Sequence, residues 1–234
     1  MKSVFFRFFT TYILILILPI ISGWFIHEIV AREFEGYIKS THQSLLSQTS
    51  RIIDQYTREI KWRVFQIANN KSLKSLMYMT PGEREETALL VRDIVGELGD
   101  YVVYSSTFNS TFYIYLGNLD LVITPHASYS LSDFLGEDDF FHMEGISARE
   151  WQDKIMSDYH PGEFMEAKRM RIEDFGKFRM DSMVPYIQSL PLGYNKAPED
   201  ISGVVIFFTM EEEFAALLNN LNIPEGGWAY ITNE

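Results

Sequence analysis

One uninterrupted apolar stretch, residues 8–26, constrains this chain more than any other feature. It holds no charged side chain and is long enough for a helix that crosses a bilayer core, which takes about 20 residues. Lys2 and Arg7 precede the stretch, and basic residues next to a span stay on the cytoplasmic side. We therefore expect a cytoplasmic tail at residues 1–7, a transmembrane signal anchor at residues 8–30, and an extracellular location for residues 31–234.

A cleaved signal peptide is the alternative for this stretch. Its apolar core would run over about 7–15 residues and would end in a cleavage site made of small residues. The apolar run here is longer, and the sequence GWFIHEIVAREFEG that follows offers no such site. Both interpretations place the rest of the chain outside the cytoplasm.

The composition limits what the exported part can be. Apolar residues make up 47% of the chain, enough for a folded core, and the chain has no cysteine, which rules out a disulfide scaffold and favours a bacterial surface. The whole chain has a formal net charge of −12, and the exported part is more acidic still because Lys2 and Arg7 belong to the tail, which disfavours contact of that part with nucleic acid or anionic lipid.

A long helix should follow the anchor, over residues 31–79. Apolar side chains recur there at intervals of three, four and seven residues, as on one face of a helix. We expect this stalk helix to pack partly on its own domain and partly on a second copy of the chain. The seam for that homodimer would be formed by Phe34, Ile38, Leu45 and Ile52.

The remaining sequence predicts an α+β fold. A helix is expected at residues 83–98, and a hairpin should turn at Gly117-Asn118 between two strands rich in Tyr, Val and Ile. The capping-box pattern from Ser147 to Glu150 predicts a short helix, whereas residues 159–179 look charged and irregular. Further elements are expected in the order strand 183–191, strand 203–209, a helix ending near residue 221, and strand 228–232. A last strand without a partner suggests that a second module begins at residues 225–234 and is cut short.

Taken together, these pieces resemble the double Cache sensor region of bacterial membrane receptors, with its PAS-like antiparallel sheet. The likeness is carried by FFRFFTTYILILILPI, FYIYLGNLDLVIT, VPYIQSLPLG, SGVVIFFTMEEEFAALLNNL and GGWAYITNE. The chain is similar above all to Firmicute, Paenibacillus-type transcriptional regulators of the AraC class. The resemblance implies a membrane-distal Cache module at residues 80–224 and a small-molecule ligand. It also implies a second membrane helix and a DNA-binding output domain, although sensor histidine kinases share this outer region.

The resemblance also implies where a ligand would bind: on the sheet, beneath a short helix. By position this indicates Tyr113, Tyr115, Arg149, Trp151 and Tyr186. Members that bind amino acids carry Arg-x-Trp-Tyr at the short helix, and here Gln152 replaces the final Tyr, which puts an amino-acid ligand in doubt. A small organic or sugar-like ligand would suit these aromatic side chains, although for any one of them a role in filling the core is the favoured interpretation.

No catalytic residue, metal site or cofactor is expected. His126, His142 and His160 are scattered, and the acidic run at residues 137–139 lacks the glycine and terminal glutamate of a calcium loop. Neither a zinc-protease motif, a nucleophile elbow nor a phosphate-binding loop is present. Two rivals to a receptor remain: a membrane-anchored surface scaffold without a signalling role, and an exported hydrolase.

Overall fold

The computed structural model of the chain describes residues 2–80, 84–104, 108–135, 142–174, 177–193, 197, 200–219, 221 and 231. The chain divides into two compact units, Met1–Arg51 and Ile52–Glu234, which are described in turn. Helix α1 (Lys2–Ala68) begins in the first unit and ends in the second.

The first unit is helical. Among the described residues, α1 is the helix long and apolar enough to cross a membrane, by length and composition, and the side chains of its apolar window are exposed. Pro19 lies inside the helix without ending it, and the Ser22 hydroxyl donates to the carbonyls of Leu18 (2.9 Å) and Pro19 (3.1 Å). The expected apolar helix at the N-terminus is confirmed, and it is a candidate membrane span.

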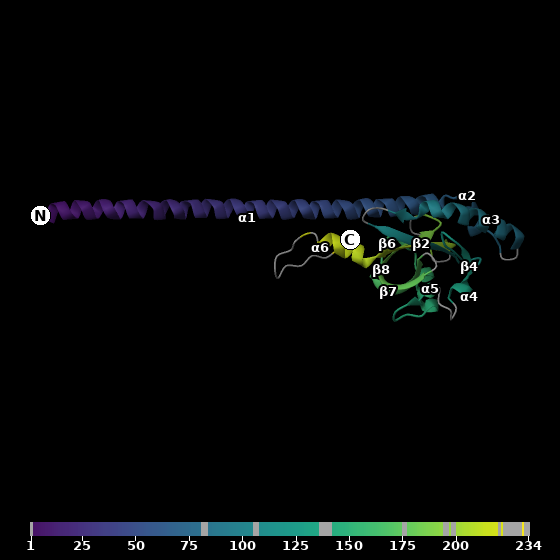
Figure 1. Ribbon diagram of the computed structural model, residues 1–234. Coiled ribbons are helices and arrows are strands. Elements are labelled where there is room, and N and C mark those ends of the chain that lie inside the picture. The colour runs from purple at the N-terminus through teal and green to yellow at the C-terminus, as the bar shows by residue number, and fades with distance from the viewer. Residues whose placement is uncertain are drawn as a thin grey trace. The chain divides into compact units, whose positions relative to one another are not determined.

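The second unit is α+β, as expected (Figure 1). Its described strands form one antiparallel sheet in the order β4-β3-β2-β9-β8-β7-β5, with β1 paired to β2 and β6 paired to β8. The helices are α2 (Lys71–Met77), α3 (Arg84–Leu98), α4 (Leu131–Phe134), α5 (Ala148–Ser157) and α6 (Glu211–Asn219), with a 3-10 turn, η1, at Gly99–Tyr101. The strands are β1 (Val103–Tyr104), β2 (Asn109–Leu116), β3 (Leu121–Ile123), β4 (Ser128–Ser130), β5 (His142–Met143), β6 (Pro161–Phe164), β7 (Lys168–Asp174), β8 (Lys177–Leu190) and β9 (Gly203–Met210).

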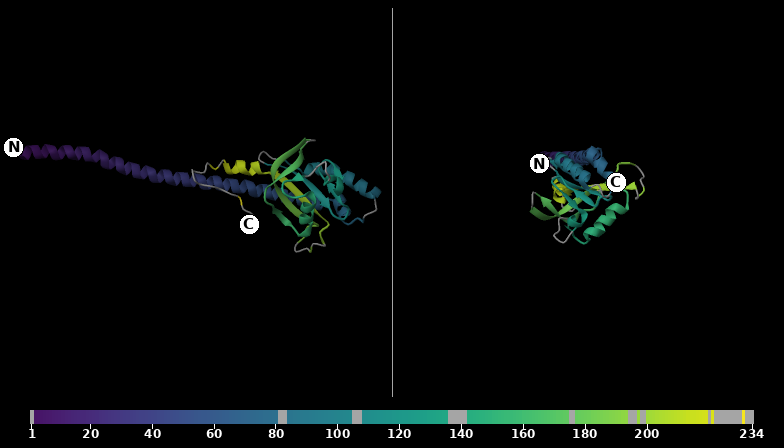
Figure 2. Two further views of the ribbon diagram at one scale, coloured as in Figure 1. Left: turned by 90° about the horizontal axis from the view of Figure 1, so that it is seen from below. Right: turned by 90° about the vertical axis from the view of Figure 1, so that its right-hand side faces the viewer.

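Both faces of the sheet are covered by helices. Successive side chains of a strand point to opposite sides, so each strand contributes to two separate cores. Phe112, Ile114 and Leu116 of β2 join a core formed with the C-terminal part of α1, α2, α3 and α6. Tyr113 and Tyr115 join a second core, which includes residues of α4 and α5. We call these sides the α1 face and the α5 face. Figure 2 shows the strands between the two groups of helices.

The expected continuous helix over residues 31–79 is wrong in its last part. Helix α1 ends at Ala68, and α2 begins after Asn70, whose side chain accepts a hydrogen bond from the Leu73 N–H (3.1 Å). Asparagine is a strong N-cap residue, and the Asn69-Asn70 pair is the signal that apolar spacing alone overlooks. The apolar face itself is real, since Tyr56, Ile60 and other members of it are buried in the core of the α1 face.

The expectation that residues 159–179 are irregular is also wrong. This segment forms β6 and β7, which pair with β8. The charged side chains and the breakers Pro161 and Gly162 give this segment little resemblance to a strand in the sequence. Pairing with β8 stabilises them, and the register shifts at Gly162 to accommodate a bulge.

The last expected strand, residues 228–232, lies outside the described residues except for residue 231, and so does most of the segment at residues 225–234. The incomplete second module therefore stays a prediction.

Candidate functional site

The start of helix α5 is fixed by a capping box at its N-terminus. Ser147 and Glu150 form the predicted capping box: the Ser147 hydroxyl accepts from the Glu150 N–H (3.2 Å) and the Glu150 carboxylate accepts from the Ser147 N–H (2.9 Å). The Ser147 hydroxyl also donates to the Glu150 carboxylate (2.6 Å), and this bond, together with the one from the Ser147 N–H, holds the pKa of the Glu150 carboxyl below its usual value. With the first turn fixed, Trp151 is directed onto the sheet and is 3% exposed.

Two hydrogen bonds join α5 to strand β2. The Trp151 indole N–H donates to the Tyr113 hydroxyl (3.0 Å), and the Gln152 amide donates to the Tyr115 hydroxyl (2.7 Å). Tyr113 and Tyr115 are two residues apart on β2, so both point to the α5 face. The Tyr115 hydroxyl in turn donates to Asp120 (3.4 Å) in the β2–β3 turn.

Aromatic rings surround this contact. The Tyr113 ring lies 5.3 Å from Phe134 of α4 in an edge-on arrangement and 5.2 Å from Phe208 of β9. Burial raises the pKa of the Tyr113 hydroxyl, and the hydrogen bond from Trp151 opposes that shift. The hydroxyl is therefore a neutral hydrogen-bonding group rather than a base.

The structure brings together three of the five residues indicated by the sequence: Tyr113, Tyr115 and Trp151. Arg149 lies in the first turn of α5 and is exposed. Tyr186 lies on the opposite face of the sheet, in the core of the α1 face, where its ring meets Phe164 at 5.1 Å. A single pocket lined by all five residues does not form.

Sequence reasoning missed two contributors to this region. Gln152 stands out in the sequence only as a departure from the family pattern, yet its side-chain amide donates a hydrogen bond to the Tyr115 hydroxyl. Asp120 belongs to no sequence motif; its backbone has a φ of 46°, and its carboxylate accepts a hydrogen bond from the Tyr115 hydroxyl. A polar residue in the tight turn of a hairpin was the available signal.

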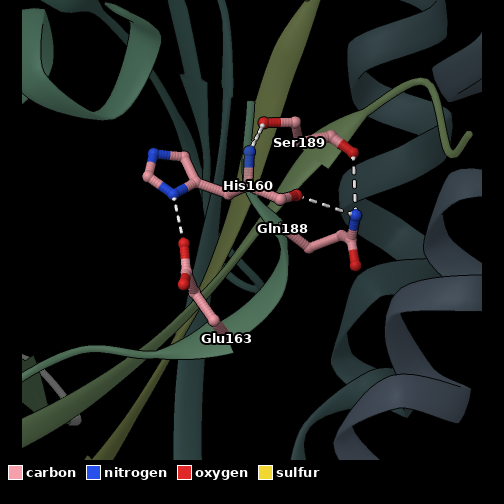
Figure 3. Close-up of polar contacts among 4 residues, drawn as sticks. All are labelled: His160, Glu163, Gln188 and Ser189. Atoms are coloured by element: carbon pink, nitrogen blue, oxygen red, sulfur yellow. Dashed lines mark hydrogen bonds and ion pairs between the residues drawn. The ribbon is translucent and has the colours of Figure 1, made fainter. Parts of the chain in front are cut away.

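A second set of polar residues lies around His160, next to β6 (Figure 3). The His160 Nδ1 atom lies 2.9 Å from the Glu163 carboxylate, and the His160 N–H donates to the Ser189 hydroxyl (2.9 Å). The Gln188 amide donates to the His160 carbonyl (3.1 Å). Of the three histidines that looked scattered in the sequence, this one is 7% exposed.

A shallow hollow also lies at the start of α6. It is lined by Asp181, Ser182, Met210, Glu211, Glu212 and Ala215. Glutamates in the first turn of a helix are favoured by the helix dipole, and the Ser182 hydroxyl donates to Glu211. The charge of this hollow therefore has a structural explanation.

The chemistry of these groups suits binding. Within the described part of the chain, no three His, Asp or Glu side chains are grouped so that they could hold a metal ion. The α5 face combines buried aromatic rings with hydroxyl and amide groups, a combination of side chains typical of small-molecule sites. No protein-family model, no curated protein and no solved structure matches this chain, so the candidate site rests on its own geometry.

Proposed function

We propose that this chain is the extracytoplasmic sensing region of a bacterial transmembrane signalling receptor. Residues 1–7 lie in the cytoplasm, residues 8–30 cross the membrane, and the folded unit lies outside. One observation carries the proposal: the helix that contains the membrane-span candidate also supplies core residues to the folded unit, among them Ile60 and Val64. A change in the core thus acts on the same helix that enters the bilayer.

The proposed receptor class is a Cache-type sensor of an AraC-class transcriptional regulator. It is supported by the element order, in which a long helix precedes an antiparallel sheet with helices on both faces. The ligand is a small molecule bound on the α5 face near Tyr113, Tyr115 and Trp151. The output domain and second membrane helix belong to the rest of such a receptor.

A chain of contacts connects the α5 face to α1. Phe208 packs against Tyr113 on the α5 face. The next residue of β9, Thr209, points to the α1 face and shares a hydrogen bond with the Tyr56 hydroxyl of α1, and both residues are buried. Tyr56 also stacks on Phe108 with ring centroids 4.0 Å apart. A ligand that favours one of two arrangements of Phe208 would shift α1 through this contact.

A homodimer through the stalk belongs to this proposal. Phe34 and Ile38 are exposed in the unit Met1–Arg51. Ile52, expected in the same seam, packs against the core of its own folded unit, so the seam for a partner ends before it. Single cysteines introduced at Ile38 and Leu45 should form disulfide-linked dimers in membranes, and failure at both positions contradicts the dimer.

The topology is tested by labelling, because the chain has no cysteine of its own. Glu166→Cys, at an exposed site of the folded unit, should react with a membrane-impermeant maleimide in intact cells. Ser3→Cys, in the cytoplasmic tail, should react only after lysis. Protection of Glu166→Cys in intact cells, with labelling after lysis, would overturn the proposed location and with it the sensing role.

A further inference from the structure

The side chain of His160 contains a buried nitrogen atom whose hydrogen-bonding capacity is unused within the described part of the chain. Its Nε2 atom is buried and finds no hydrogen-bond partner among the described residues. The side chain is 10% exposed, whereas that of Glu163 is 43% exposed, so the pair reaches from the interior to solvent. A buried acceptor without a partner is unfavourable, and such atoms in native proteins call for an explanation.

The contacts around His160 fix its ring and its tautomer. The Glu163 carboxylate at Nδ1 can only accept, so Nδ1 carries the proton. In the neutral imidazole, the Nε2 atom is then a hydrogen-bond acceptor. Two hydrogen bonds with Ser189 hold the residue in place: the His160 N–H donates to the Ser189 hydroxyl, and the Ser189 N–H donates to the His160 carbonyl (3.0 Å).

The imidazole lies on the α5 face. Glu163 is opposite Ile187 in the β6–β8 register, and Ile187 belongs to the core of the α5 face. Residues opposite each other in a sheet point to the same side, and the contact with Glu163 brings the His160 ring to that side. Figure 3 shows the imidazole and the Glu163 carboxylate on one side of the strand and the Gln188 amide on the other.

We propose that His160 is a ligand-binding residue of the α5 face, and that its Nε2 atom accepts a hydrogen bond from a hydroxyl group of a small neutral polyol or sugar. This assignment rests on the proposed sensing function and names the ligand class for it. A hydroxyl supplies the donor that the Nε2 lone pair lacks. A carboxylate has no proton to donate, and it would face the acceptor atom and the Glu163 charge.

The ligand class also fits the other groups of this face. Gln152 of the same face is half-buried, and its side-chain amide can provide a further hydrogen bond to such a ligand. Arg149, which would hold a carboxylate in the family pattern, is exposed, so it does not join this set.

The test uses the full chain in lipid nanodiscs with ¹⁵N-labelled histidine. Two probe sets are added separately: glucose, xylose, myo-inositol and glycerol as neutral hydroxylated probes, and acetate, citrate and aspartate as carboxylates. A neutral probe should bind and shift the Nε2 resonance of His160. His160→Asn, which keeps an amide near the Nδ1 position but removes Nε2, should weaken that binding about tenfold. His142→Asn, the same change at an exposed histidine of β5, should leave the affinity within about twofold.

The outcomes separate this inference from the function on which it rests. If a probe binds with the same affinity to His160→Asn, or if only carboxylates bind, the role of His160 is overturned and the sensing function stands. If no probe of either set binds, both are overturned. Should His160→Asn fail to fold, an Nε2 resonance of the unaltered chain that stays still during binding would by itself overturn the inference.

Discussion

Replacing Gly162 with alanine should destabilise the folded unit more than the same change at any other described glycine with positive φ. Gly162 sits at the bulge of β6 with a φ of 103°. A Cβ atom there would overlap the Gln188 side-chain oxygen and the Tyr186 hydroxyl, and would lie 3.3 Å from Tyr186 Cζ. Gln188 and Tyr186 are 8% and 1% exposed, so neither side chain can move into solvent freely.

The size of the effect follows from two separate costs. A non-glycine residue in this backbone region costs about 1–2 kcal/mol. Forcing an extra methyl group into a packed interior costs about 1–3 kcal/mol more. Gly145 provides the matched control: its φ is 82°, but an added Cβ would meet nothing within 4 Å. We therefore expect a loss of about 2–5 kcal/mol for Gly162→Ala and about 1–2 kcal/mol for Gly145→Ala.

The measurement is urea unfolding of the full chain in detergent micelles, followed by near-UV circular dichroism. This signal reports packed aromatic rings in the folded unit, and the free energy of unfolding is obtained by linear extrapolation. Equal losses for the two variants, within about 0.5 kcal/mol, would refute the overlap at Gly162. The polar arrangement around Gln188 and His160 would then have to be revised as well.

Three further predictions use the same unfolding assay. Ile60→Ala should cost about 2–5 kcal/mol, because Ile60 is fully buried where α1 meets the sheet; a loss below about 1 kcal/mol would contradict that packing. Trp151→Phe should cost about 1–2 kcal/mol of stability, and clearly less in a chain that already carries Tyr113→Phe, because Trp151 and Tyr113 share a hydrogen bond. Equal costs in the two backgrounds would argue against that bond. Burial raises the pKa of the Tyr113 hydroxyl, so the unfolded chain loses this proton at a lower pH than the folded chain does. The free energy of unfolding should therefore fall as the pH rises above about 10. Tyr113→Phe should make this fall shallower, and an unchanged slope would contradict the raised pKa.

Local signals in the sequence were enough for the elements that stabilise themselves. The Ser147 capping box places the start of α5 correctly, and the hairpin turn at Gly117-Asn118 separates β2 from β3 as expected. The apolar spacing along α1 identifies the face that is buried from Ile52 onward. In each case the residues that carry the signal are neighbours in the chain.

The parts that could not be predicted depend on pairing between distant residues. β7 is rich in charge and has little strand propensity, and its existence follows from the long N-terminal half of β8 that pairs with it. The face on which Tyr186 lies depends on the registers of β2 with β9 and of β9 with β8, and a change of one residue in either would move it. The polar contacts of His160 could not be predicted for the same reason. Glu163 is nearby in sequence, but Ser189 and Gln188 come from another strand.

The separation of the two faces decides how a sensor built on this fold can work. The candidate binding groups lie on the α5 face, whereas the helix that leads to the membrane-span candidate packs on the α1 face. A ligand therefore cannot push on α1 directly, and the signal has to pass through a strand. Strand β9 can do this because Phe208 touches Tyr113 on one face and Thr209 bonds to Tyr56 on the other. If the proposed function holds, these adjacent residues of β9 are where binding is converted into a movement of the helix.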